Sequence, residues 1–114
     1  MIVDDNVGFL SAARDVLERQ GIVVVGTAST TAEAVELARK VAPDVALVDI
    51  DLGDESGFDV ALRLTEMAGN ERMRLVLISA YAESDFADLI AASPAVGFLS
   101  KPDLSASAIH ALLG

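Results

Sequence analysis

Five short runs of apolar residues recur along the chain, and the segments between them are amphipathic. The runs are rich in Val, Ile and Leu and occupy residues 1–3, 22–26, 45–48, 75–78 and 96–99. Near-continuous apolar runs of this length are typical of strands buried on both faces, as in a parallel sheet. The pattern therefore predicts five buried strands.

The intervening segments carry apolar residues at helical spacing, which predicts a helix after each strand. Thr30 and Glu33 are spaced as a capping box, and Ser105 is placed to cap the last helix. The expected helical segments are 9–17 with a stop at Gly21, 30–41 ending before Pro43, 58–65 closed by Gly69-Asn70, 86–90 ending before Pro94, and 105–113. Five strands alternating with five helices predict a doubly wound α/β fold, and we expect residues 1–114 to form one domain.

Composition narrows the classes of function. The chain is 53% hydrophobic, so it can bury a core, and it has no cysteine, which excludes disulfides and thiolate-bound metals. Its net charge of −10 repels phosphate backbones and anionic membranes, so we expect no nucleic-acid partner and no membrane partner. The first residues lack the features of a signal peptide, and no apolar stretch is long enough to span a bilayer, so we expect a cytoplasmic protein.

Polar residues gather where the predicted strands end. The residues that follow strands one, three, four and five are Asp4 and Asp5, Asp49 with Asp51 close by, Ser79, and Lys101. Ligands of open α/β sheets bind outside the carboxyl ends of the strands, and right-handed crossovers bring these ends to one edge. Clustered carboxylates without His or Cys suit a hard cation, most plausibly Mg²⁺. With a hydroxyl and an ammonium beside them, they indicate a phosphoryl site in which a carboxylate is the nucleophile.

Each of these residues also has an ordinary structural explanation when it is taken alone. The Asp4-Asp5-Asn6 stretch has the residue types of a helix cap, and Asp49 is a common turn residue. Taken alone, Ser79 would be explained as a small polar residue at a strand end, and Lys101 as a solvated loop lysine. Their joint occurrence at successive strand ends favours one shared site.

Together these residues resemble the receiver domain of two-component response regulators, and in particular the chemotaxis-regulator type. The motif comprises Asp4-Asp5, Asp49, Ser79-Ala80 and Lys101-Pro102. Asp49 follows Asp5 by 44 positions and precedes Ser79 and Lys101 by 30 and 52, spacings typical of that family. The resemblance covers the whole chain and implies a flavodoxin-like (βα)5 fold with strand order 2-1-3-4-5.

The resemblance also implies a role for each matching residue. Asp49 matches the phospho-acceptor, and Lys101 matches the lysine that pairs with the phosphoryl oxygens. Ser79 and Phe98 match the hydroxyl and aromatic switch residues. The implied Mg²⁺ ligands are Asp4, Asp5, Asp49 and the backbone carbonyl of Asp51. Asp54 and Glu55 are interpreted as solvated loop charges, and Gly57 as the residue that lets the loop turn into the third helix.

The implied function is a phosphorylatable switch rather than an enzyme, although the domain would assist its own phosphotransfer and dephosphorylation. A histidine kinase or a phosphotransfer protein would supply the phosphoryl group. The response would appear on the surface of the fourth helix, fifth strand and fifth helix, through which a homodimer is possible. The Lys101-Pro102 bond is commonly cis in the family.

Two other classes of protein fit part of the sequence. The Asp49-Ile50-Asp51-Leu52 string also resembles the DxD motif of haloacid-dehalogenase-type phosphatases, although there the motif lies on the first strand of a larger protein. A pseudo-receiver that works only as an interaction module would be expected to lack an acceptor, acidic-pair or lysine residue, and none is missing here.

One departure from the receiver family is Gly53, which stands where many receivers have proline. This glycine predicts a more mobile loop.

The first strand is short, since only three residues precede Asp4. The strands expected on either side of it are longer than Ile2-Val3 can pair with. We therefore expect unpaired backbone groups at the lower end of the sheet, and a native start a few residues earlier or a trimmed chain.

Overall fold

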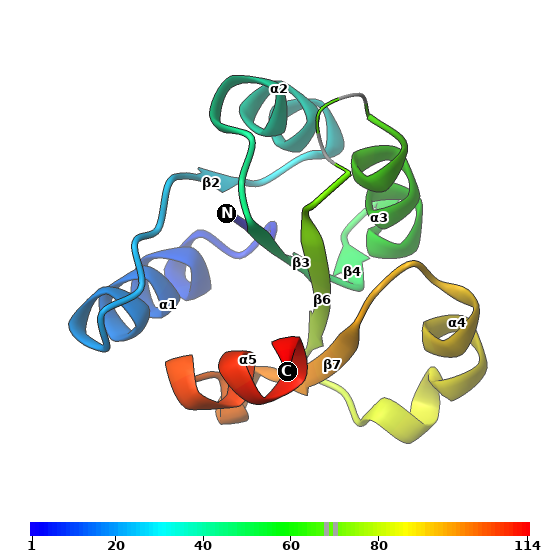
Figure 1. Ribbon diagram of the computed structural model, residues 1–114. Helices are drawn as coiled ribbons and strands as arrows, with labels where there is room; N and C mark the ends of the chain where they lie inside the picture. The colour runs from blue at the N-terminus through cyan, green and yellow to red at the C-terminus, as the bar shows by residue number, and fades with distance from the viewer. Residues whose placement is uncertain (68, 70) are drawn as a thin grey trace.

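A five-stranded parallel sheet forms the centre of the molecule (Figure 1). The computed structural model describes residues 1–67, 69 and 71–114. The strands are β1 (Ile2–Val3), β2 (Thr27–Ala28), β3 (Val45–Asp49), β6 (Arg74–Ser79) and β7 (Gly97–Ser100). They lie in the order β2-β1-β3-β6-β7, which is the predicted order 2-1-3-4-5. The predicted doubly wound α/β fold is confirmed.

Helices cover both faces of the sheet (Figure 1). One face carries α1 (Val7–Arg19) and α5 (Ala106–Leu113), and the other carries α2 (Thr31–Val41), α3 (Gly57–Glu66) and α4 (Ala87–Ala92). Short 3-10 turns, η1 (Glu83–Asp85) and η2 (Lys101–Asp103), precede α4 and α5. Within the described residues, no helix has the length and apolar character needed to cross a membrane.

Strand residues alternate between two apolar cores. Val3, Val48 and Leu77 pack toward α2 and α3, whereas their neighbours Ile2 and Leu47 pack toward α1 and α5. Successive side chains of a strand point to opposite faces, so strands buried on both sides must be apolar at every position. This requirement explains the continuous Val, Ile and Leu runs of the sequence.

The helix starts depend on side-chain caps, because the first N–H groups of a helix have no partner within it. Asn6 Oδ1 accepts from Phe9 N at 3.0 Å, Thr30 Oγ1 from Glu33 N at 3.1 Å, and Ser105 Oγ from Ala108 N at 3.0 Å. The capping box predicted at Thr30 is only half formed. The Glu33 carboxylate instead accepts from the backbone and hydroxyl of Ser29.

The second strand is displaced from its predicted position at residues 22–26. It is confined to Thr27–Ala28, because β1 offers only Ile2 and Val3 as pairing partners. Two further bonds join Ile2 N to Gly26 O and Asp4 N to Ala28 O. Residues 22–25 belong to no strand, and the Val24 carbonyl accepts from the Arg14 guanidinium instead. The predicted mismatch in strand length is confirmed for β3, which has five residues against two in β1, but not for β2, which is no longer than β1.

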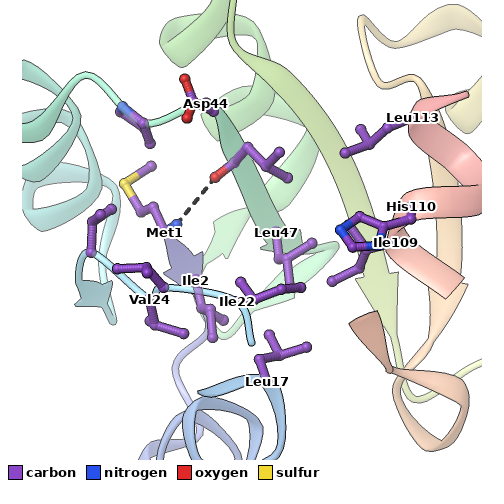
Figure 2. Close-up of a pocket in the computed structure, with 14 residues that line it drawn as sticks. Met1, Ile2, Leu17, Ile22, Val24, Asp44, Leu47, Ile109, His110 and Leu113 are labelled. Carbon is purple, nitrogen blue, oxygen red and sulfur yellow. Dashed lines mark hydrogen bonds between the residues drawn. The ribbon is translucent and has the colours of Figure 1, made fainter. Parts of the chain in front are cut away.

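An apolar pocket of about 260 Å³ lies at the N-terminal end of β1, where Met1 and Ile2 line it. Ile22 and Val24 line it on one side, and His110 and Leu113 face it from α5 (Figure 2). The Met1 ammonium reaches into this region and donates to the Val45 carbonyl at 3.1 Å (Figure 2). Burial lowers the pKa of this ammonium to about 6, and nearby Asp44 opposes the shift only in part.

Smaller features also differ from the predictions. A two-stranded hairpin, β4 (Asp51–Leu52) with β5 (Glu55–Ser56), replaces the loop expected after β3, and Gly53 adopts φ +72° at its turn. The Lys101–Pro102 bond is trans rather than cis, and both residues belong to the η2 turn. The fifth strand lies one residue later than predicted. The third helix ends at Glu66, and Asn70 of its predicted stop lies outside the described residues.

Candidate functional site

Three buried polar side chains mark the carboxyl ends of the central strands. Asp4 follows β1, Asp49 ends β3 and Ser79 ends β6, with exposed fractions of 0%, 5% and 1%. Each accepts a hydrogen bond from the backbone N–H two residues further on. The donors are Asn6 N to Asp4 Oδ1 at 2.9 Å, Asp51 N to Asp49 Oδ1 at 3.0 Å, and Tyr81 N to Ser79 Oγ at 2.9 Å. These bonds turn the chain away from the sheet and fix one side-chain oxygen of each residue.

The Lys101 ammonium bridges two of the carboxylates. Its Nζ lies 2.7 Å from Asp4 Oδ2 and 2.9 Å from Asp49 Oδ2, and its side chain is only 18% exposed. Lys101 follows β7 directly, so its long side chain passes the end of β6 to reach β3 and β1. The structure thus brings together residues from three strand ends that are far apart in the sequence.

Asp4, Asp5 and Asp49 form an acidic cluster, in which one carboxylate oxygen of each residue lies within 4.8 Å of the others. Asp4 Oδ2 is fully buried, and the Lys101 ammonium lies 2.7 Å from it. Three carboxylates are balanced by a single ammonium, so the cluster keeps excess negative charge. An oxygen-only donor set that keeps excess negative charge fits a hard divalent cation such as Mg²⁺.

Burial dominates the electrostatics of Asp49. It raises the pKa of this carboxyl from 3.8 to about 6, and repulsion from Asp4 acts in the same direction. The hydrogen bond from Asp51 N and the contact with Lys101 oppose the shift. Burial lowers the pKa of Lys101, but the two carboxylates outweigh it and the pKa of Lys101 is raised. The ammonium is therefore charged at neutral pH.

A cavity of about 240 Å³ opens at this edge of the sheet. Asp5, Asp49, Asp51, Ser79 and Lys101 are among the residues that line it. The grouping predicted from the strand ends therefore occurs in the structure. The acidic cluster consists of side chains, and the proposed role of the Asp51 carbonyl as a ligand stays a prediction.

Two interpretations of the loop after β3 need correction. Glu55 is not merely a solvated charge, because its Oε1 accepts from Thr31 N at 2.9 Å and ties the hairpin to the start of α2. Gly57 is required by close approach rather than by a flexible turn. A Cβ atom there would lie 1.9 Å from the Asp49 carbonyl oxygen, so only glycine lets α3 begin against the end of β3.

Phe98 lies inside the protein. It is 8% exposed and packs in the core on the side of α2 and α3. The ring of Phe9, which sequence reasoning did not select, lies under the Lys101 ammonium at 4.5 Å from Nζ to the ring centroid. The only sequence signal for Phe9 was its place in the apolar stripe of the first helix, which indicates burial and not a partner.

The chain belongs to the response regulator receiver domain family, whose match covers residues 1–113. It is 31% identical over 102 residues to the polar-differentiation response regulator DivK of Brucella ovis, covering 90% of this chain and 82% of that protein. It is also 34% identical over 105 residues to the protein-glutamate methylesterase/protein-glutamine glutaminase of Archaeoglobus fulgidus, covering 90% of this chain. The chain spans only 29% of that protein and 48% of a Pseudomonas aeruginosa relative.

Solved structures agree with this assignment. A response regulator from Burkholderia pseudomallei has a TM-score of 0.84 at 29% identity, covering 97% of this chain and 64% of that one. That crystal structure contains a phosphorylated aspartic acid and a calcium ion. A LuxR-family two-component response regulator from Aurantimonas has a TM-score of 0.85 at 27% identity, covering 99% of this chain and 82% of that one. Phosphorylation and Mg²⁺ binding are general features of the receiver family.

Proposed function

We propose that residues 1–114 form a single receiver domain that acts as a phosphorylatable switch, with Asp49 as the acceptor. The observation that carries this proposal is the Lys101 ammonium held 2.9 Å from Asp49 Oδ2 and 2.7 Å from Asp4 Oδ2 at an open edge of the sheet. The donor is a phosphohistidine of a histidine kinase or of a phosphotransfer protein.

In the transfer, a carboxylate oxygen of Asp49 attacks the phosphorus atom. A new P–O bond forms as the P–N bond to the donor histidine breaks, and the histidine takes up a proton as it leaves. Lys101 offsets negative charge on the phosphoryl oxygens, and Ser79 donates its hydroxyl to one of them. In a separate step, water attacks the phosphorus atom of the acyl phosphate, the P–O bond to Asp49 breaks, and inorganic phosphate leaves, which returns Asp49 to its free carboxylate.

Asp4, Asp5 and Asp49 would hold Mg²⁺, together with the Asp51 backbone carbonyl. The ion supplies positive charge that offsets the charge of the transferred group. Because a ligand bound only by the folded state stabilises it, we expect the melting temperature to rise with Mg²⁺ concentration. Scanning calorimetry at increasing Mg²⁺ concentrations measures this rise in melting temperature. The proposed site is wrong if Asp5→Ala, which removes one ligand at an exposed position, shows an equal rise.

The acceptor is tested by labelling with a small acyl phosphate. Incubation with acetyl phosphate and Mg²⁺ should add one phosphoryl group to Asp49, located by mass spectrometry of the intact chain and its peptides. Asp49→Ala should take up none. Undiminished labelling of that variant would refute Asp49 as the acceptor, whereas turnover of a generic phosphomonoester would favour a phosphatase instead.

The response is expected on the surface of α4, β7 and α5. Attraction of the Ser79 hydroxyl to the phosphoryl group would shift the population between two packings of the Phe98 region, without a new fold. Exposed apolar side chains already lie near this surface, among them Leu89 and Val96. They support contact with a target or a homodimer, which sedimentation equilibrium with and without beryllofluoride tests.

A further inference from the structure

In the described part of the chain, three groups lie close to the Lys101 ammonium, and two of them are carboxylates. The third is the aromatic ring of Phe9, whose centroid lies 4.5 Å from Nζ. A cation at this distance over a ring face is attracted by the ring quadrupole, and the attraction grows as water is removed. With its side chain 18% exposed, Lys101 is shielded enough for the contact to matter.

The position of Phe9 is fixed by the start of α1. Its N–H donates to Asn6 Oδ1 at 3.0 Å, so the residue belongs to the capped first turn of the helix. Its side chain packs against the apolar core between α1 and the sheet. The ring is therefore a rigid surface, whereas the lysine beside it has a flexible four-carbon stem.

We propose that Phe9 is a positioning residue that keeps the Lys101 ammonium beside Asp49 during phosphoryl transfer. The proposal rests on the proposed function of Asp49 and adds a residue to it. A divalent cation bound by Asp4 and Asp49 would share the carboxylates that hold Lys101 and would weaken both ion pairs. The ring contact involves no carboxylate, so it persists when the ion pairs weaken.

The size of the effect follows from the strength of such contacts. A cation–π contact at a partly exposed site corresponds to roughly a two- to fivefold change in an equilibrium or a rate. We therefore expect Phe9→Leu, which keeps an apolar side chain but removes the ring, to slow labelling of Asp49 by about that factor. Phe9→Tyr retains the ring face and should label at nearly the wild-type rate.

The experiment uses acetyl phosphate, because Phe9 also lines an apolar groove with Val16 and Leu104 on which a protein donor could dock. Val16→Ala is the matched control, since it alters the same groove about two helical turns from Phe9 and leaves the ring in place. Labelling rates of the wild type and the three variants are measured at saturating Mg²⁺. In parallel, NMR records the shift of the Lys101 ε protons, which a ring face moves upfield.

The proposal predicts slow labelling and loss of the upfield shift in Phe9→Leu, with both restored in Phe9→Tyr and unchanged in Val16→Ala. Equal rates in Phe9→Leu and wild type overturn it, as does equal slowing in the Leu and Tyr variants, which would reflect packing alone. If the wild type is not labelled at all, the proposed acceptor fails. The NMR comparison then still decides whether Phe9 holds the ammonium.

Discussion

Burial opposes ionisation most clearly at two groups, the Asp49 carboxyl and the Met1 ammonium. Burial raises the pKa of Asp49 to about 6 and lowers the pKa of the Met1 ammonium to about 6. The two groups lie at opposite ends of the sheet, one at the open edge and the other in the pocket at the N-terminal end of β1. They affect the pH dependence of stability with opposite signs.

Between pH 4 and 6, Asp49 is ionised in the unfolded chain but protonated in the folded one. The unfolded state then binds fewer protons, so the free energy of unfolding falls as pH rises. Between pH 6 and 8 the unfolded Met1 amine keeps a proton that the folded one has lost, and the free energy of unfolding rises. We expect a minimum of stability near pH 6 in metal-free buffer, measured by urea denaturation.

Each arm of this profile has its own control. Asp49→Asn should remove the fall below pH 6, and acetylation of the Met1 amine should remove the rise above it. Since one pKa unit corresponds to about 1.4 kcal/mol, each arm should be no deeper than roughly 3 kcal/mol. A flat profile for the wild type would contradict the burial of both groups.

The residues of the site differ in how far the sequence reveals them. Asp4, Asp49, Ser79 and Lys101 were predictable, because strand ends can be read from hydrophobic runs and parallel strands end at one edge. The sequence indicates a glycine turn at Gly57 but not the reason for the glycine. Its close approach to the Asp49 carbonyl depends on where α3 meets β3. Phe9 was not found, because a cation–π contact across two elements leaves no pattern in the sequence.

At the scale of elements, partners decide which apolar runs become strands. Residues 22–25 are all β-branched, yet β1 pairs only with Thr27 and Ala28, which follow them. A strand is stabilised by its ladder and not by its composition alone. The hairpin of β4 and β5 was missed for the opposite reason, because its strands of two residues each carry no apolar run.

This dependence predicts the effect of lengthening β1. A variant with three β-forming residues such as Val-Leu-Ile added before Met1 can pair with residues 22–25 and with β3, and it places an amide where the ammonium now lies. Backbone groups that gain partners contribute about 0.5–1.5 kcal/mol each. We expect a melting temperature several degrees higher, measured by circular dichroism, and tighter Mg²⁺ binding through a better anchored Asp4.

A flexible Gly-Ser-Gly extension of the same length is the control for this variant. It removes the terminal charge at Met1 without favouring a strand. An equal gain in both variants would assign the effect to the ammonium, and no gain in either would show that β1 is long enough.

Across the whole molecule, the helices differ in how much they bury against the sheet. Helices α1, α2, α3 and α5 each bury residues against the sheet, whereas α4 and η1 bury none. Local unfolding free energy is lowest where few apolar contacts are buried. The segment that joins Ser79 to β7 is therefore the part of the described chain most easily shifted by a change at Ser79.

Binding of beryllofluoride, which imitates a phosphoryl group on Asp49, should consequently perturb the molecule on one side. Backbone amide shifts from two-dimensional NMR should change most within residues 79–100, since Ser79 begins this segment, η1 and α4 lie loosely within it, and Phe98 packs in the adjoining core. Asp49→Asn should show none of these changes with the same reagent, which separates the response from non-specific binding. Changes confined to residues 7–40 would contradict the proposal, because they would place the response on α1 and α2, where buried side chains hold the helices to the sheet.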